Sequence, residues 1–252
     1  MIQHLGALGV SVPGGFATTA HAFRAFMKEN GLNEEIASIL KGLDTKDVVA
    51  LRKAGAACRK AVLSKPFSAQ LEGQIEDCYQ RMCSEYRNGN DVDVAVRSSA
   101  TAEDLPNASF AGQQETFLNV RGCSDVVQAC HKCFASLFTD RAISYRVQMG
   151  FDHNQVALSV GIQLMIRSDL AASGVMFSID TESGFRNAVL INGAYGLGEN
   201  VVQGAVNPDE FVVFKPTLKD NKRPILEKRL GSKEIRMIYD IGYSNYILSN
   251  LV

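Results

Sequence analysis

The chain of 252 residues carries 26 Lys and Arg against 27 Asp and Glu, a formal net charge of -1, and 46% of its residues are hydrophobic. This length and apolar fraction are typical of a globular chain with a sizeable core. The near-neutral charge argues against a nucleic-acid partner held mainly by phosphate contacts.

The first third of the sequence favours helices. Apolar residues recur every three or four positions over residues 43–63, with Asp44 as the expected N-cap, and Pro66 prevents any continuation. The same spacing over residues 68–88 predicts a second helix, with Ser68 as N-cap and Asn88 at its end. We expect the two helices to pack against each other.

After residue 90 the apolar period changes to that of strands. Strands that cluster after early helices favour an α+β arrangement over strict alternation of strands and helices. The predicted strands are residues 92–96, 116–120, 156–166, 175–179, 188–191 and 211–214.

Arg97 and the hydroxyl residues after it follow the first predicted strand. An arginine and several small hydroxyl residues at a strand end present N–H and O–H donors that suit a phosphate. The alternative is a solvated loop in which Glu103 or Asp104 pairs with Arg97. The residues of this segment favour neither interpretation over the other.

Gly112 stands in a polar segment that runs directly into the strand at residues 116–120. A glycine allows backbone N–H groups to approach a bound polyphosphate without a Cβ in the way. The same glycine is equally suited to a simple turn.

Residues 125–148 have helical spacing and contain Cys130 and Cys133, the one Cys-x-x-Cys pair of the chain. A zinc site needs a second pair at matching spacing, so we interpret these cysteines as small apolar members of a core stripe. His131 is expected to point off that stripe. The predicted stripe contains Val127, Cys130, Phe134, Leu137 and Phe138.

The glycines of residues 193–199 follow the strand at residues 188–191 and precede Glu199. Their order does not fit the dinucleotide-binding fingerprint, and the chain has no Gly-Lys dipeptide for a phosphate loop. A nucleotide bound here therefore requires a different fold.

Neither charge-free segment, residues 156–166 and 187–198, approaches the ~20 apolar residues that span a bilayer. The first ten residues lack the positive charge that opens a secretory signal. Without such a signal, six cysteines are typical of reduced thiols. We therefore expect a cytoplasmic protein without a membrane partner.

Three segments, residues 94–120, 163–185 and 193–216, closely resemble the amino-terminal nucleotide-binding domain of the phosphoenolpyruvate synthase (pyruvate, water dikinase) family. Residues 12–19, Val-Pro-Gly-Gly-Phe-Ala-Thr-Thr, resemble an early segment of the same family. Related dikinases and rifampin phosphotransferases share the Arg-Ser core, whereas residues 177–185 look specifically like the synthase.

The resemblance implies an ATP-grasp-like fold, in which two α+β lobes clamp ATP, with residues 1–252 as one ATP-binding domain. It assigns Arg97 to the phosphates as the catalytic residue, and Gly112 and Thr116 to a loop that covers them. Gln163 matches a hinge residue near adenine, with Met165 beside it. Glu199 is a further candidate for the nucleotide or its metal, and Ser178 is a further candidate for contact with a phosphate.

The family reaction converts ATP, pyruvate and water to AMP, phosphoenolpyruvate and phosphate through a phosphohistidine. Fixed positive charge and Mg²⁺ must offset the phosphate oxygens in such a transfer. None of the four histidines lies in a Gly- and Thr-rich segment like that of the family's phosphorylated histidine. The partners that we expect are therefore the phosphohistidine and pyruvate-binding domains of a longer chain, and a homodimer is compatible with this arrangement.

Two alternatives stay open beside the synthase. One is the ATP-binding domain of a rifampin-type phosphotransferase or another dikinase, and the other is a nucleotide-binding module without transfer chemistry. The resemblance ends near residue 238, and residues 241–247 do not continue it. We therefore expect a fragment of a multidomain enzyme that does not complete the reaction by itself.

Overall fold

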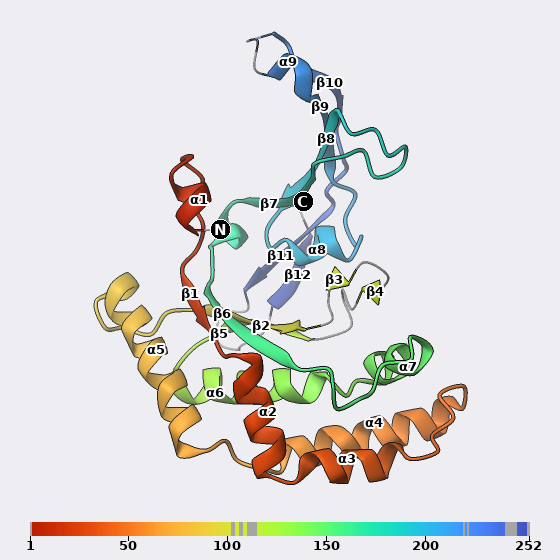
Figure 1. Ribbon diagram of the computed structural model, residues 1–252. Coiled ribbons are helices and arrows are strands. Elements are labelled where there is room, and N and C mark those ends of the chain that lie inside the picture. The colour runs from red at the N-terminus through yellow and green to blue at the C-terminus, as the bar shows by residue number, and fades with distance from the viewer. Residues whose placement is uncertain are drawn as a thin grey trace. The chain divides into compact units, whose positions relative to one another are not determined.

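The computed structural model describes residues 2–101, 104–105, 108–109, 115–218, 220, 222–239 and 246–250. The chain divides into two compact units, Met1–Met165 and Ile166–Val252, and each unit is described by itself. Figure 1 labels the elements of both units.

The first unit contains all the longer helices of the described chain. Serine, threonine or aspartate caps four of them: Thr19, Asp47, Ser68 and Thr139 each accept a hydrogen bond from a backbone N–H in the first turn. The helices are α1 (Ile2–Gly6), α2 (Ala20–Glu29), α3 (Leu32–Leu40), α4 (Val48–Leu63), α5 (Ala69–Arg87), α6 (Cys123–Ser136) and α7 (Asp140–Gln148).

The prediction for α5 is confirmed at both ends, because Ser68 caps it and Asn88 ends it in the left-handed conformation with φ 51°. The predicted Asp44 cap of the preceding helix is wrong. Asp47 accepts from the N–H groups of Val49 and Ala50, so the cap lies three residues after Asp44 and α4 begins at Val48.

The single helix predicted over residues 125–148 is also wrong. The chain forms two helices, because Thr139 caps α7 by accepting from the Ala142 N–H at 3.3 Å. The core-packing prediction for the cysteines is confirmed, since Cys130 and Cys133 are fully buried. His131 was predicted to point off the stripe. Its ring packs against Phe67, with the two ring centroids 4.8 Å apart.

Four strands form the main sheet of the first unit in the order β1-β6-β2-β5, with all neighbours antiparallel. The strand predicted over residues 156–166 is observed as β6, which is two residues shorter at each end. A separate pair, β3 (Asp104–Leu105) with β4 (Ala108–Ser109), lies between β2 and β5 in sequence. The sheet strands are β1 (Gly15–Ala17), β2 (Val94–Ala100), β5 (Thr116–Val120) and β6 (Leu158–Leu164).

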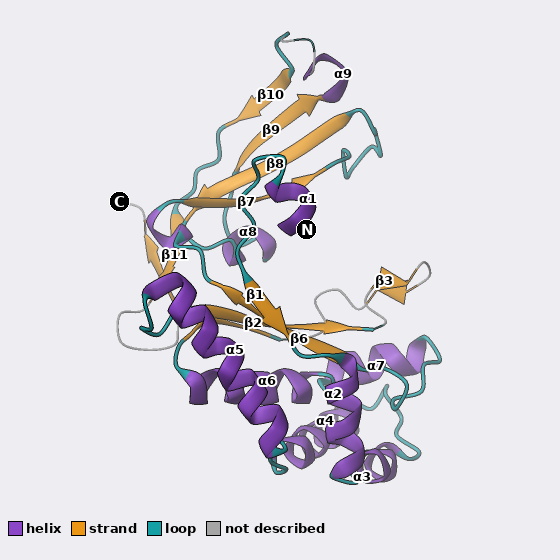
Figure 2. Cartoon of the chain, turned by 60° about the vertical axis from the view of Figure 1, so that its left-hand side comes forward, coloured by secondary structure: helices purple, strands orange, loops and turns teal. Residues whose placement is uncertain are grey.

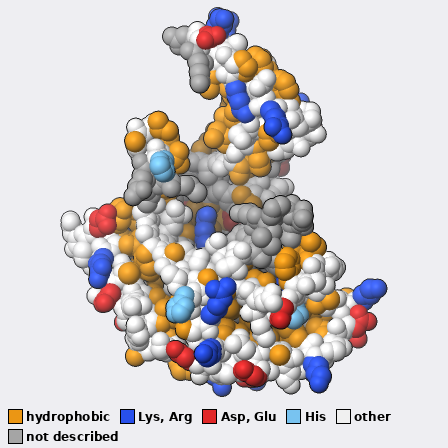
Figure 3. All heavy atoms as spheres, in the orientation of Figure 1, with side chains coloured by type: hydrophobic (Ala, Val, Ile, Leu, Met, Phe, Trp, Pro, Cys, Tyr) orange, Lys and Arg blue, Asp and Glu red, His pale blue; other side chains and the backbone are white. Residues whose placement is uncertain are grey.

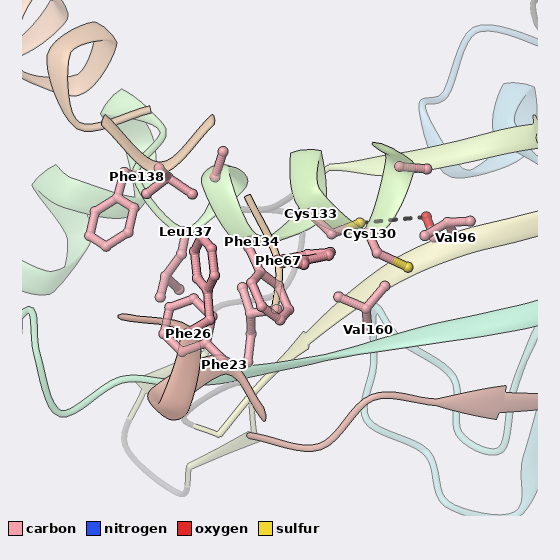
Figure 4. Close-up of a cluster of buried hydrophobic side chains, with 14 of the residues drawn as sticks. Phe23, Phe26, Phe67, Val96, Cys130, Cys133, Phe134, Leu137, Phe138 and Val160 are labelled. Atoms are coloured by element: carbon pink, nitrogen blue, oxygen red, sulfur yellow. Dashed lines mark hydrogen bonds between the residues drawn. The ribbon is translucent and has the colours of Figure 1, made fainter. Parts of the chain in front are cut away.

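Helices α2 and α6 pack on one face of this sheet, as Figure 2 shows. Side chains alternate between the faces of a strand, so Val96 and Val160 point toward the helices and are fully buried. Figure 4 shows the core on this side, where the Cys133 thiol lies 3.9 Å from the Val96 carbonyl oxygen. Burial raises the pKa of the Cys130 thiol to about 12.

The second unit is built on another antiparallel sheet, in the order β10-β9-β8-β7. The predicted strand at residues 188–191 continues to Tyr195, so Gly193 lies within a strand. The strands are β7 (Ala172–Phe177), β8 (Ala188–Tyr195), β9 (Asp209–Phe214) and β10 (Ile225–Arg229), with β11 (Ile235–Tyr239) paired to β12 (Tyr246–Asn250) and the short helices η1 (Ser168–Leu170), α8 (Glu199–Val202) and α9 (Lys215–Leu218).

Helices and antiparallel sheets in both units confirm the α+β class predicted from the sequence. Across the described ranges, none of the helices combines the length and the apolar character needed to span a bilayer. On the face shown in Figure 3, basic and acidic side chains are interspersed over the first unit.

Candidate functional site

Arg97 lies in the interior of the first unit's sheet, at a position where β2 is paired on both sides. Its register partners are Thr116 on β5 and Gly161 on β6. Residues directly opposite each other in a sheet project from the same face. Because Val96 faces the helices, Arg97 and Thr116 project from the opposite face, which we call the open face, and both are exposed.

The Arg97 guanidinium forms no hydrogen bond or ion pair with the residues that the structure describes. Pairing with Glu103 or Asp104 is untested, since both of those side chains lie outside the described part. An unpaired guanidinium keeps its fork of five donors available for an anion.

Gln163 lies opposite Ala95, one row along the strands from Arg97. Because the side-chain period of a strand is two, Gln163 shares the open face with Arg97. Its Nε2 atom donates to the Pro13 carbonyl oxygen at 3.5 Å. Met165 follows β6 and donates its backbone N–H to the Asp93 carbonyl oxygen at 2.9 Å, which extends the β2–β6 pairing by one residue.

Small residues keep the open face low around Arg97. A Cβ added at Gly161 would meet no neighbouring atom closer than the Arg97 carbonyl oxygen, at 3.8 Å. Sequence reasoning missed Gly161 and Ser159, although they stand two and four residues before Gln163. The available signal was the two-residue repeat of side chains along β6. It identifies the residues beside Arg97 only once the pairing of β6 with β2 is known.

Gly112, predicted to cover the phosphates, lies outside the described residues. Thr116, predicted with it, is the first residue of β5 and lies opposite Arg97. The structure therefore brings Arg97, Thr116 and Gln163 to one face of one sheet, with Met165 just beyond the strand.

Ser178 belongs to the second unit and follows β7 directly. The Lys215 ammonium donates to the backbone carbonyl oxygens of Ser178 and Arg186, and so ties the end of β7 to the segment that precedes β8. The loop between them is closed by Asp180, whose carboxylate accepts from the Glu182 N–H and the Ser183 hydroxyl. These hydrogen bonds lower the pKa of Asp180. The Ser178 side chain is exposed.

Glu199 is the first residue of α8, and the glycine segment before it is held against β11. Gly196 has φ +83°, and a Cβ there would meet the Met237 carbonyl oxygen at 2.3 Å. The Leu197 N–H donates to that same oxygen at 2.9 Å. Glycine is therefore required for close packing on β11. The Glu199 carboxylate is half-buried and accepts from the Gln203 amide at 2.7 Å.

Ser178 and Glu199 lie in a different unit from Arg97, so a cleft that joins all these residues stays a prediction. Within the described ranges, no three His, Cys, Asp or Glu side chains are grouped as ligands for a metal ion. What the first unit offers is a cationic, hydroxyl-bearing surface that suits a phosphate.

Comparison with known proteins also indicates a domain that binds a phosphate-bearing ligand. Residues 1–249 match the family described as pyruvate phosphate dikinase, AMP/ATP-binding domain. The chain is 63% identical over 249 residues to the phosphoenolpyruvate synthase of Synechocystis sp., which covers 97% of this chain and 30% of that protein.

More distant relatives are also matched over only part of their length. The chain is 57% identical over 239 residues to the phosphoenolpyruvate synthase of Escherichia coli (strain K12), covering 95% of this chain and 30% of the relative. It is 45% identical over 232 residues to a probable phosphoenolpyruvate synthase of Methanocaldococcus jannaschii, covering 92% of this chain and 19% of the relative. The chain thus spans 30% or less of these three relatives. It belongs to the pyruvate phosphate dikinase AMP/ATP-binding domain family.

Proposed function

We propose that the chain is the ATP-binding, phosphoryl-donating part of a phosphoenolpyruvate synthase. The full-length enzyme would convert ATP, pyruvate and water to AMP, phosphoenolpyruvate and phosphate through a phosphohistidine. The observation that carries the proposal is the position of Arg97 on the open face, in register with Thr116 and one row from Gln163, where it forms no ion pair with a described residue.

The open face fits a nucleotide in both charge and shape. Arg97 supplies positive charge, and the Thr116 hydroxyl supplies a donor beside it. Gly161, which has no side chain, leaves room for a ligand beside Arg97. Gln163 carries an amide with both donor and acceptor atoms, which suits the edge of a base.

The residues of the chain would act by positioning and by charge. Phosphoryl transfer needs little covalent help from a protein, because the attacking and leaving oxygens must mainly be aligned and their charge offset. Arg97 would hold the phosphates in place and stabilise the charge that develops on them. Mg²⁺, when bound, would neutralise further phosphate charge, and we propose Glu199 for the nucleotide or its metal, since carboxylate oxygens suit this ion.

We further propose an ATP-grasp-like arrangement, in which the two units are lobes that clamp ATP, with Ser178 and Met165 as additional nucleotide neighbours. Two separate antiparallel sheets support this proposal. The phosphohistidine and pyruvate-binding domains would belong to the same full-length chain, which in turn would form a homodimer. All six cysteines are free thiols, which supports a cytoplasmic location.

The test is product analysis with the full-length protein, ATP and Mg²⁺. We expect AMP, phosphoenolpyruvate and phosphate in equal amounts when pyruvate is present. AMP formed with rifampin and not with pyruvate would replace the synthase by a rifampin-type phosphotransferase. ATP binding without AMP formation under either condition would indicate a nucleotide-binding module without transfer activity.

A further inference from the structure

A pair of serine hydroxyls lies on the open face, one row beyond Arg97. Ser99 on β2 and Ser159 on β6 are directly opposite each other, at two-residue spacing from Arg97 and Gly161. Side chains in this relationship have Cβ atoms about 5 Å apart and project together. Ser99 is exposed and Ser159 is half-buried, and neither hydroxyl is hydrogen-bonded to a described residue.

The register orders the open face along the strands. Gln163, Gly161 and Ser159 follow one another on β6, and their partners on β2 are Ala95, Arg97 and Ser99. Two residues of strand advance about 7 Å, so the serine row lies about 14 Å from the Gln163 row. Arg97 stands between these two rows.

We propose that Ser99 and Ser159 bind the distal phosphate of the nucleotide, an inference that rests on the proposed function. Gln163 is proposed for the base and Arg97 for the phosphates, so a nucleotide extended along β2 and β6 has its base at one end. Its chain of phosphates then passes Arg97 and ends at the serine row.

The chemistry of this row suits the end of a polyphosphate. Each hydroxyl has one O–H donor that can rotate toward a phosphate oxygen. None of the described strand residues on the open face is acidic, so an anion meets no like charge from the sheet itself. The serine pair would therefore distinguish ATP from AMP, which lacks the distal phosphates.

A second serine on β2 provides a matched control. Ser98 faces the helix side of the sheet, where its hydroxyl donates to the Glu115 carbonyl oxygen at 3.4 Å. It differs from Ser99 in the face from which it projects and is its neighbour in sequence. A general effect of removing a β2 hydroxyl would appear in both variants.

The experiment measures ATP and AMP affinities of the full-length protein by calorimetry, with Mg²⁺ present. We expect the double variant Ser99→Ala/Ser159→Ala to bind ATP about tenfold more weakly, with AMP affinity changed less than twofold. Ser98→Ala should leave both affinities unchanged. If the double variant loses its thermal transition, each single variant should show a several-fold loss for ATP with AMP unaffected.

Equal ATP affinity in wild type and the serine variants would overturn the inference, as would equal losses for ATP and AMP. Either result leaves the proposed function intact if the wild type binds both nucleotides. A wild type that binds neither nucleotide contradicts the proposed function itself, and the serine assignment with it.

Discussion

Arg97 and Gly161 are directly opposite each other across the β2–β6 pair, and the side of the sheet beside the guanidinium is open because residue 161 has no side chain. A Cβ at this position would be 3.8 Å from its nearest neighbour, the Arg97 carbonyl oxygen, which is an ordinary contact. The folded chain therefore has room for a larger residue here.

Gly161→Val should consequently separate ligand binding from stability. Valine is favoured in strands, so we expect an unchanged or raised melting temperature. Its side chain would occupy the space proposed for the nucleotide, and ATP affinity should fall at least tenfold. Melting curves and ATP titration of the same preparation measure both quantities.

Gly174→Val is the matched control, because a Cβ at Gly174 would meet the Asn192 carbonyl oxygen at 2.0 Å. This variant should lower the melting temperature of the second unit. A Gly161→Val protein that binds ATP like wild type would mean that the nucleotide does not lie over this row.

Tyr79 connects α5 to the segments before β2 and α6. Its ring is fully buried, and its hydroxyl donates to the Val92 carbonyl oxygen at 2.7 Å and accepts from the Gly122 N–H at 2.9 Å. Tyr79→Phe keeps the ring but leaves both backbone groups without this partner. We expect a loss of about 1–3 kcal/mol in the free energy of unfolding, measured by urea titration.

Tyr86→Phe provides the comparison on the same helix, since the Tyr86 side chain is 42% exposed. Its effect should be smaller than that of Tyr79→Phe. Equal effects of the two substitutions would show that the buried hydroxyl contributes nothing specific.

His153 should make the stability of the first unit depend on pH. The Arg146 Nε atom donates to His153 Nδ1 at 2.9 Å, and Arg146 is itself fully buried. Burial, and then the Arg146 charge, lower the pKa of His153 to about 4. Because the unfolded chain has a His pKa near 6.5, it binds the proton more readily than the folded chain between these values.

The stabilising contribution is therefore complete above about pH 6.5 and is lost as the pH falls toward 4. His153→Gln retains an acceptor for Arg146 and does not titrate, so its urea midpoint should fall less over this range. His131, whose pKa is also lowered by burial, leaves a residual slope in both proteins. Identical slopes for wild type and variant would contradict the role of His153.

Local signals explain which elements were predictable. Ser68 and Asn88 mark both ends of α5 within the sequence, and the predicted bounds agree with the structure. At α4 two aspartates compete: Asp44 accepts from the Lys46 N–H and Asp47 from two N–H groups of the first turn. Both residues are good N-caps, so residue type alone does not distinguish them, and the prediction of Asp44 was wrong.

The composition of the open face was less predictable than its central residue. Arg97 was evident because it directly follows the strand predicted over residues 92–96, although β2 continues through it to Ala100, and the resemblance added Thr116 and Gln163. Gly161 and Ser159 were missed because their neighbours depend on pairing β6 with β2, strands separated by more than fifty residues in the sequence. Such pairing is set by the assembled sheet and not by local propensity.

The most direct test of the account is the affinity of the full-length protein for ATP with Mg²⁺, measured for wild type and Arg97→Ala. The guanidinium is exposed and unpaired among described residues, so the substitution should leave the melting temperature unchanged. Loss of a charge-assisted contact of about 1.5–3 kcal/mol predicts at least a tenfold weaker affinity. Equal affinities of the two proteins for ATP would contradict the assignment of the open face to the nucleotide.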